Sequence, residues 1–353
     1  MKYSLIKPLL FSLEPEKAHN LAIFALAHNL VCSSQIKNYN SLNNEIFGIN
    51  FSNPIGLAAG FDKNAKVFDK LFNFGFSFIE CGTVTPKPQE GNPKPRLFRL
   101  KEDQAIINRL GFNNNGIEDF LKNINSKKLQ NENILGINIG KNKDTLDALD
   151  DYLLLLDRVY GFSNYITINI SSPNTKNLRD LQKADNLDEF LAAIMRKKLE
   201  LSQAKNKSIP ILLKIAPDLD NSEQESIAEI SLKNKIDGLI ISNTTINGKE
   251  KLNSIYKNET GGLSGKPLFR ASNVILKNIY KLTNGAIPII GVGGISSGLE
   301  AYEKIKCGAQ LIQIYSAFIY SGFELVEKIK QDLDKLLKQD GFTNIKQAIG
   351  KNV

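Results

Sequence analysis

Imidazole and thiol groups are scarce in this 353-residue chain, which narrows the chemistry that it can perform. Both histidines, His19 and His28, lie near the N-terminus, so everything beyond residue 28 must work without imidazole. A Ser-His-Asp triad and a histidine-based metal centre are therefore excluded there. Cys32, Cys81 and Cys307 are odd in number, far apart and without CxxC spacing. This pattern predicts a reducing compartment and argues against a disulfide framework, a zinc site or an iron–sulfur cluster.

Lys214 stands inside an apolar run, residues 211–215, where a charged side chain is unexpected. A desolvated lysine needs an anionic or hydrogen-bonding partner, so Lys214 indicates a ligand site. The alternative is a side chain whose ammonium reaches water while its methylenes stay buried.

Two later segments have the composition of a phosphate site. Gly291-Val292-Gly293-Gly294-Ile295 and Tyr315-Ser316-Ala317 each close an apolar run. Glycines let backbone N–H groups approach an anion, and the N-termini of the following helices favour negative charge. The glycines could instead only turn tight corners, but their place in the last two apolar runs favours phosphate binding.

Amides, hydroxyls and a second lysine close the other apolar runs. They fall in the segments Ala58–Asn64, Asn138–Asn142, Asn169–Thr175 and Ser242–Thr245. Any one of them could be a strand-end cap, but together with Lys214 they suit a planar, anionic ligand rich in heteroatoms. Flavin mononucleotide (FMN) fits, with its phosphate on the two glycine and serine segments and Lys214 offsetting negative charge at the N1/O2 edge of the reduced ring. A metal-dependent hydrolase would need a His/Asp/Glu cluster, which is missing, so we expect no metal.

The elements that must position these residues alternate from Pro54 onward. Eight short apolar runs are separated or followed by longer amphipathic stretches. The runs are Pro54–Ala59, Phe76–Gly82, Ile134–Ile139, Tyr165–Ile170, Ile209–Ile215, Gly238–Ser242, Ile287–Val292 and Leu311–Ile314. The stretches are Ala65–Asn73, Asn115–Ile124, Thr145–Tyr160, Leu187–Ala204, Ser222–Lys233, Phe269–Leu282, Leu299–Lys306 and Gly322–Leu337. Consecutive apolar positions are typical of parallel strands covered on both faces, so we predict an α/β fold, a closed (β/α)₈ TIM barrel.

Two insertions interrupt the alternation, residues 83–113 after the second strand and 243–268 after the sixth. Both follow the C-terminal end of a strand, which is the catalytic face of a barrel, so we expect them to line or cover a site.

Residues 1–40 predict two short apolar helices, the second beginning at Pro15. We therefore divide the chain into a helical extension (1–40), a barrel (41–340) and a C-terminal tail (341–353). No apolar run approaches the ~20 residues that span a bilayer, and no signal peptide is expected. The formal charge of +8 comes from lysines spread along the chain, without a nucleic-acid recognition motif, so we expect no nucleic-acid partner.

An ordered set of motifs resembles the class 2, quinone-reducing dihydroorotate dehydrogenases over essentially the whole chain. The motifs are Ala58–Asn64, Asn108–Asn114, Gly136–Asn142, Asn169–Thr175, Thr260–Pro267 and Gly291–Ile295. Class 1 relatives have Cys where this chain has Ser172, and the N-terminal extension also belongs to class 2.

The resemblance implies that Ser172 is the base that removes a C5 proton from (S)-dihydroorotate while a hydride leaves C6 for flavin N5. Because a serine hydroxyl hardly ionises near neutral pH, the proton must pass onward, through water near Thr175 and Phe112. Implied substrate residues are Lys63, Asn108, Arg109, Leu110, Gly111, Phe112, Asn169, Asn174, Asn243 and Thr244. Implied FMN residues are Ala59, Gly60, Phe61, Asp62, Lys63, Thr83, Asn138, Asn169, Lys214, Ser242, Gly265, Gly294, Tyr315 and Ser316.

Two positions depart from the family pattern. Ser242 stands where Thr is expected and keeps the hydroxyl without the methyl group. Lys176-Asn177 replaces a Pro- or Gly-bearing segment beside the base, which could alter the mobility of that loop.

The resemblance also implies that the N-terminal helices give a membrane quinone access to the flavin, with His19 as a polar contact and His28 structural. We expect a monomer attached peripherally to the cytoplasmic side of a bacterial cell membrane. Two alternatives are a class 1 enzyme that uses fumarate or NAD, and a non-enzymatic binding protein on a barrel scaffold. Electron-acceptor tests separate the first, and a missing flavin spectrum would indicate the second.

Overall fold

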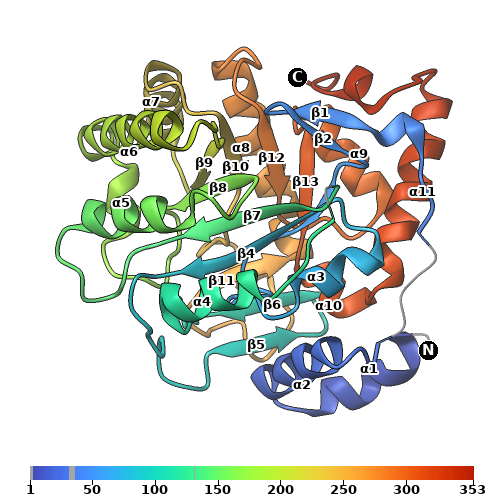
Figure 1. Cartoon of the computed structure of the whole chain (residues 1–353). Helices are drawn as coiled ribbons and strands as arrows, with labels where there is room; N and C mark the ends of the chain where they lie inside the picture. Colours follow the sequence, from blue (N-terminus) through green and yellow to red (C-terminus); the bar gives the residue numbers. More distant parts are fainter. Residues whose placement is uncertain (1–2, 32–35, 131) are drawn as a thin grey trace.

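The eight apolar runs form one closed barrel of parallel strands, as predicted (Figure 1). The structure is a computed structural model that describes residues 3–31, 36–130 and 132–353. The barrel strands are β3 (Ile55–Leu57), β4 (Phe78–Val84), β7 (Ile134–Ile139), β8 (Tyr165–Asn169), β9 (Ile211–Ile215), β10 (Gly238–Ile241), β12 (Ile289–Val292) and β13 (Leu311–Ile314). Neighbours follow the chain, and the β13–β3 pairing closes the ring.

Helices cover the outside of the barrel. They are α3 (Phe68–Leu71), α4 (Gly116–Asn125), α5 (Ala148–Val159), α6 (Ala184–Lys205), α7 (Asn221–Lys233), α8 (Phe269–Leu282), α9 (Gly298–Lys306), α10 (Ser316–Ser321) and α11 (Glu324–Gln339). Apolar side chains from these helices and the strands form one large core outside the barrel wall, which includes Phe68, Ile166, Leu276 and Leu333. Consecutive apolar positions on the strands fit this burial, since both faces of each strand are covered.

Two helices differ from the prediction. The stretch Ala65–Asn73 contains only α3 and a following 3₁₀ turn, because the Asp62 carboxylate accepts the N–H groups of Lys66 and Val67 at 2.8 and 2.7 Å and holds a loop there. The stretch Gly322–Leu337 was predicted to begin at Gly322. The structure instead ends α10 at Ser321, turns at Gly322 with a φ of +76°, and begins α11 at Glu324.

The two insertions pair with each other. β5 (Leu97–Leu100) and β6 (Ala105–Asn108) from the first insertion join β11 (Gly262–Gly265) from the second in an antiparallel sheet of order β11-β6-β5. Phe98, Leu100, Ala105, Ile107, Leu252 and Leu263 form its small apolar core. This sheet was not predicted, and it lies over the C-terminal ends of the barrel strands.

Opposite ends of the barrel are closed differently (Figure 1). At one end, the hairpin β1 (Asn44–Ile46) and β2 (Ile49–Phe51) places Phe51 against Phe78 inside the barrel, with ring centroids 5.4 Å apart. Near the other end, α1 (Tyr3–Ser12) and α2 (Pro15–Ala27) pack beside β5 and α10. Within the described residues, no helix is both long enough and apolar enough to cross a bilayer.

The segment predicted as a C-terminal tail is packed against the barrel. A 3₁₀ turn, Ile345–Ala348, buries Ile345 and Ala348 completely, and the Asn352 N–H donates to the Lys306 carbonyl at 2.8 Å.

Candidate active site

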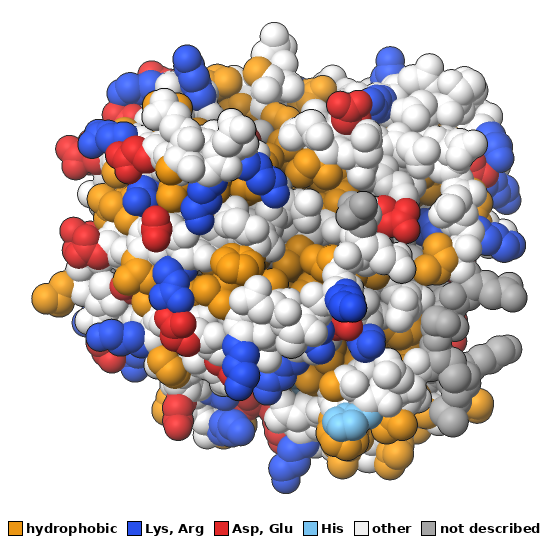
Figure 2. Space-filling model, viewed as in Figure 1, with side chains coloured by type: hydrophobic (Ala, Val, Ile, Leu, Met, Phe, Trp, Pro, Cys, Tyr) orange, Lys and Arg blue, Asp and Glu red, His pale blue; other side chains and the backbone are white. Residues whose placement is uncertain are grey.

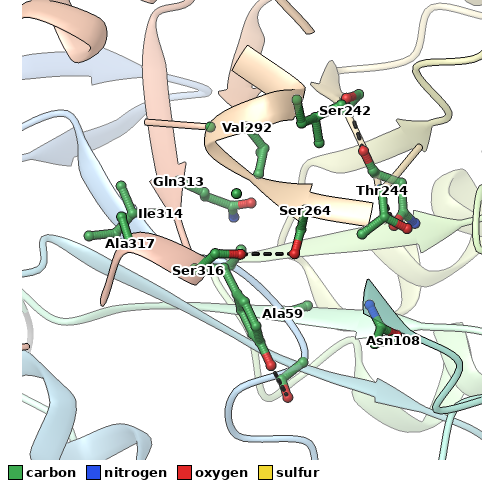
Figure 3. A pocket seen from close by; sticks show the side chains of 18 of the residues that line it. Ala59, Asn108, Ser242, Thr244, Ser264, Val292, Gln313, Ile314, Ser316 and Ala317 are labelled. Carbon is green, nitrogen blue, oxygen red and sulfur yellow. Dashed lines mark hydrogen bonds between the residues drawn. The ribbon is translucent and has the colours of Figure 1, made fainter. Parts of the chain in front are cut away.

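The C-terminal ends of the barrel strands surround a cavity that brings most of the expected residues together (Figure 3). The expected residues that line it are Ala59, Gly60, Lys63, Thr83, Asn108, Leu110, Gly111, Phe112, Asn169, Ser172, Asn174, Lys214, Ser242, Asn243, Thr244, Gly265, Gly294, Tyr315 and Ser316. Strand ends converge at one face of a barrel, which explains why residues so far apart in sequence meet here.

Four expected residues do not line this cavity. Phe61 and Asp62 line a second cavity beneath the N-terminal helices, and Asp62 is occupied with the backbone of the loop before α3. Arg109 turns away and pairs with Glu259 at 2.6 Å. Asn138 is completely buried and donates to the Glu80 carboxylate. Asp62, Arg109 and Asn138 therefore form bonds within the protein, and their roles as ligand contacts stay predictions.

A buried carboxylate lies inside the barrel below the cavity. Glu80 of β4 is only 1% exposed and accepts hydrogen bonds from four side chains on three other strands. The donors are Asn138 Nδ2 at 2.8 Å, Gln313 Nε2 at 2.9 Å, Tyr165 Oη at 3.1 Å and Thr167 Oγ1 at 3.2 Å. A buried charge is tolerated when it is fully hydrogen-bonded, so this layer is a rigid polar floor within an otherwise apolar barrel.

Lys214 of β9 is 6% exposed and lines the cavity above this floor. Its ammonium forms no hydrogen bond or ion pair with a described residue. Burial lowers the pKa of Lys214, and the negative charge of Glu80 opposes that shift. A desolvated ammonium facing a cavity without a partner is suited to an anionic or electron-rich ligand.

The floor is connected to the cavity wall by side-chain hydrogen bonds. Thr83 Oγ1 donates to Asn138 Oδ1 at 2.5 Å, and Asn169 Nδ2 lies 3.1 Å from the same oxygen. Asn169 is the neighbour of Lys214 across the β8–β9 pair. These bonds fix the amide of Asn169 so that its orientation is set before any ligand binds.

Ser172 lies in the loop after β8 and is 7% exposed. Its Oγ accepts the Asn174 N–H at 3.3 Å. Asn174 Nδ2 reaches the Asn108 carbonyl at 3.1 Å, which ties this loop to β6 of the insertion sheet. The hydroxyl of Thr175 nearby is buried and has no hydrogen-bond partner among the described residues. An unpaired buried hydroxyl is costly, so it indicates a place for water or ligand.

Arg179 holds the Ser172 loop against two other loops. Its guanidinium donates to the Ser171 carbonyl at 3.0 Å, to the Asp218 carboxylate at 2.8 Å and to the Thr244 carbonyl at 3.0 Å. The planar guanidinium of Arg179 thereby connects the loops after β8, β9 and β10.

The loops after β12 and β13 form the opposite side of the cavity. Gly293 and Gly294 have φ values of +114° and +74°, which favour glycine. The hydroxyls of Ser316 and Ser264 are 2.8 Å apart, so the second insertion contributes to the same corner (Figure 3). Backbone N–H groups, small residues and hydroxyls together suit a phosphate group.

A second cavity lies between the N-terminal helices and the barrel. Apolar side chains of α1 and α2 line most of it, and it shares Lys63, Leu110 and Tyr315 with the first cavity. Burial lowers the pKa of Lys63 to about 8, and the nearby Glu16 carboxylate opposes this shift. His19 faces Phe61 edge-on with ring centroids 5.2 Å apart, and burial lowers the pKa of its imidazole to about 3. His28 lies elsewhere, with Nδ1 2.9 Å from the Phe24 carbonyl.

Sequence reasoning missed Glu80, Gln313, Arg179 and Ser264. Glu80 and Gln313 stand inside the apolar runs Phe76–Gly82 and Leu311–Ile314, the same signal that singled out Lys214. Applying that criterion to every run would have found the polar floor. Arg179 and Ser264 carry no such signal, because their partners are set by loop packing.

Comparisons with known proteins agree over nearly the whole chain. A family model described as dihydroorotate dehydrogenase matches residues 41–337. The dihydroorotate dehydrogenase (quinone) of Acinetobacter baylyi is 49% identical over 332 residues, which cover 93% of this chain and 98% of the relative. The protein of the same name from Azorhizobium caulinodans is 45% identical over 353 residues, 99% of each chain. A crystal structure of DHODH in complex with ferulenol from Eimeria tenella has a TM-score of 0.92 at 40% identity, covering 98% of each chain. The chain therefore belongs to the dihydroorotate dehydrogenase family, among its quinone-dependent members.

Proposed function

We propose that this protein oxidises (S)-dihydroorotate to orotate, with bound FMN as the hydride acceptor and a membrane quinone as the final electron acceptor. This is the fourth step of de novo UMP synthesis. The observation that carries the proposal is a polar cavity holding Lys214 and Ser172 that shares a wall with an apolar cavity. A site that takes a hydride from a polar substrate and passes electrons to a lipid-soluble acceptor needs these two environments side by side.

The residues of the polar cavity fit FMN. The unpaired ammonium of Lys214 suits the N1/O2 edge of the ring. Asn169 and Thr83, which are hydrogen-bonded to each other at 3.0 Å, line the same cavity. Gly294, Ser316 and the backbone after β12 would hold the phosphate. When bound there, FMN would supply a hydride acceptor at N5 and hold the two electrons until they are passed on. Lys214 would stabilise the negative charge that the reduced ring carries.

Amide side chains would hold the substrate. Asn108, Asn174, Asn243 and Thr244 line one side of the cavity, and Lys63 lies at the wall shared with the second cavity. Asn243 is fixed by donating to Ser171 Oγ at 3.0 Å and to Asn169 Oδ1 at 3.3 Å. Amides match the donor and acceptor pattern of the dihydroorotate ring, and Lys63 offers positive charge for its carboxylate.

Ser172 would accept the C5 proton. No carboxylate or imidazole of a described residue hydrogen-bonds to its Oγ, so the proton must leave by another route. The unpaired, buried hydroxyl of Thr175 would hold one water that receives the proton, and Phe112 lines the same cavity as Ser172. Burial of Ser172 keeps bulk water from the reacting carbon.

The second cavity would admit the quinone from a membrane surface. Hydrophobic side chains (orange) gather over α1 and α2 in Figure 2. Among them, Leu5, Leu9 and Phe24 are 73%, 65% and 53% exposed. Such a face suits a helix pair lying in the lipid interface, and it supports peripheral attachment to the cytoplasmic side of a bacterial cell membrane. His19 would contact the quinone as a neutral imidazole, since its pKa of about 3 keeps it uncharged near neutral pH.

The test is a pair of half-reactions on the purified yellow protein. Dihydroorotate should bleach the flavin absorption without oxygen, and a ubiquinone analogue should restore it. Rapid restoration by NAD or fumarate, with inertness toward quinones, would overturn the assignment of the acceptor. A purified protein that has no flavin absorption and does not bind FMN supplied in excess would overturn the whole proposal.

A further inference from the structure

A second buried lysine lies beneath the loop after β12, behind the wall of the polar cavity. Lys304 of α9 is completely buried. The Cγ and Cδ atoms of Lys304 pack closely against Gly291. A Cβ atom added to Gly291 would lie 2.7 Å from both of them. The Lys304 ammonium donates to Ser272 Oγ at 2.6 Å and lies 5.3 Å from the centroid of the Phe269 ring. Lys304 forms no ion pair with a described residue.

Each of these contacts leads to the glycine loop that lines the cavity. Ser272 Oγ lies 2.9 Å from the Phe269 carbonyl of its own helix and 3.1 Å from the Gly293 carbonyl. Phe269 packs so closely under Gly294 that a Cβ there would lie 2.5 Å from the Phe269 Cβ. One hydroxyl group therefore separates the Lys304 ammonium from the Gly293–Gly294 peptide, whose N–H belongs to the proposed phosphate site.

The charged groups around Lys304 leave it without a counterion. The acidic groups that act on Lys304 are Cys307, Glu303 and Glu300, on α9 or at its end. Each raises the pKa of Lys304 through space, without a hydrogen bond or ion pair to its ammonium. The Glu300 carboxylate accepts from Ser296, and the Glu303 carboxylate accepts from Asn273. β12 carries no titratable side chain, and from α8 the Phe269 ring and the Ser272 hydroxyl approach the ammonium. α11 also packs against α9, and none of its described charged groups shifts the pKa of Lys304. Burial lowers the pKa of Lys304 to about 7, so an anion nearby would change its protonation near neutral pH.

We infer that Lys304 is the buried countercharge of the FMN phosphate, a positioning residue that acts through Ser272 and the Gly293–Gly294 peptide. The ammonium polarises the Ser272 hydroxyl, whose single hydrogen is shared between the Phe269 and Gly293 carbonyls. The share that reaches Gly293 strengthens the Gly294 N–H as a donor to the phosphate. The charge also acts directly, since a cation without a counterion in a dry interior attracts an anion over several ångströms. The inference rests on the proposed function.

The test compares FMN with riboflavin, which lacks the phosphate. Holoenzyme is titrated with riboflavin, and the ratio of riboflavin to FMN at half exchange measures what the phosphate contributes to binding. Lys304→Met keeps the length and removes the charge, so this ratio should fall roughly 10-fold to 100-fold. Lys304→Arg, which keeps the charge, should restore most of it. Equal weakening of both flavins would mean that Lys304 only fills space, and would overturn the inference.

A pH series on the unmodified holoenzyme needs no variant to fold. Between pH 7 and pH 9 the phosphate stays a dianion, because its second pKa is about 6. Without bound FMN, Lys304 loses its proton above its pKa of about 7, so FMN binding must restore that proton. The ratio should therefore fall as pH rises, by up to about tenfold per unit. A flat profile would overturn the inference.

Two further outcomes separate this inference from the proposed function. Ser272→Ala breaks the link between ammonium and loop, and it should lower the ratio less than Lys304→Met does; an unchanged ratio would overturn the role of Ser272. An unmodified protein that binds neither flavin would defeat the proposed function itself. If the protein binds FMN but Lys304→Met leaves the ratio of riboflavin to FMN unchanged, only the inference is overturned.

Discussion

The two cavities of this protein share a wall and are built in opposite ways. The polar cavity stands on hydrogen-bonded side chains from several barrel strands, with Glu80, Asn138 and Asn169 fixed in one network. The second cavity is lined by apolar side chains of two helices. Polar contacts attach those helices from outside the cavity, among them the Glu16–Arg96 pair at 2.9 Å and Arg99 bonded to the Leu10 and Leu13 carbonyls.

The difference follows from what each cavity is proposed to do. Hydride and proton transfer depend on groups held within a fraction of an ångström, which a barrel supplies. A lipid-soluble acceptor needs apolar surface and room to enter, which the cavity beneath the helix pair supplies. Changes in the polar cavity should therefore affect the substrate half-reaction, and changes in the helices should affect the quinone half-reaction.

The largest effect is expected for Ser172→Ala. Without the hydroxyl, the C5 proton has no acceptor, so the rate of flavin reduction by dihydroorotate should fall roughly 10²-fold to 10⁴-fold. The spectrum of the bound flavin and its reoxidation by quinone should stay unchanged in stopped-flow measurements. Ser231→Ala removes a buried hydroxyl on α7 that has no hydrogen-bond partner among the described residues, and as a control it should cost much less. Near-normal reduction by the Ser172 variant would remove Ser172 from the mechanism.

The next largest effect is expected for Lys214→Met. Loss of the ammonium leaves the reduced ring without a countercharge, so flavin reduction or flavin retention should fall roughly 10-fold to 100-fold. The flavin absorbance that remains with the protein after gel filtration measures retention. Lys198→Met, which removes a lysine paired with Asp237 at 2.6 Å outside the polar cavity, is the matched control. Equal behaviour of the two variants would make Lys214 a bystander.

Arg179→Gln should slow flavin reduction by roughly tenfold, because the Ser172 loop loses its bonds to the loops after β9 and β10. Arg179→Lys should recover part of the rate, since it keeps the charge but not the planar fork. Reoxidation by quinone and the melting temperature of the holoenzyme serve as internal controls. A parallel loss in both half-reactions would show a general structural role instead.

Deleting residues 1–40 should affect mainly the second cavity and the quinone half-reaction. The KM for a long-chain quinone should rise several-fold, because the apolar cavity and the exposed face are lost. Activity with a soluble dye should change little, since the barrel keeps the polar cavity. If both activities fall together, the extension serves the folding of the barrel and the contrast between the cavities fails.

The smallest effect concerns pH. The folded-state pKa of His19, about 3, lies below its ordinary value of 6.5, so protonation opposes docking of α2. The stabilisation is complete above pH 6.5 and declines as pH falls from there toward 3. Limited proteolysis of the N-terminal helices should therefore become faster at pH 5 than at pH 7.5. His19→Phe should remove this difference, and a difference that persists in the variant would assign it to another group.

The sequence alone determined the barrel and most of the polar cavity. Apolar runs and amphipathic stretches report burial locally, and eight strand–helix units leave few closed arrangements. Once the barrel is predicted, residues at strand ends must share one face, which is why Lys63, Asn169 and Lys214 could be grouped before the structure was known. The acceptor came from resemblance and agrees with the quinone-dependent relatives. The membrane face and the role of Ser172 also came from resemblance, and they stay predictions for the experiments above.

Only the tertiary structure decided how distant segments pair. β6 and β11 meet across about 150 residues, and nothing in either strand encodes its partner, because β-pairing is selected by packing of the whole fold. The same holds for side-chain direction: Arg109 turns to Glu259, while Glu80 and Lys304 turn inward to become buried charges. A pattern of apolar and polar residues specifies which positions are buried; the partner of each buried charge depends on three-dimensional contacts that the pattern does not contain.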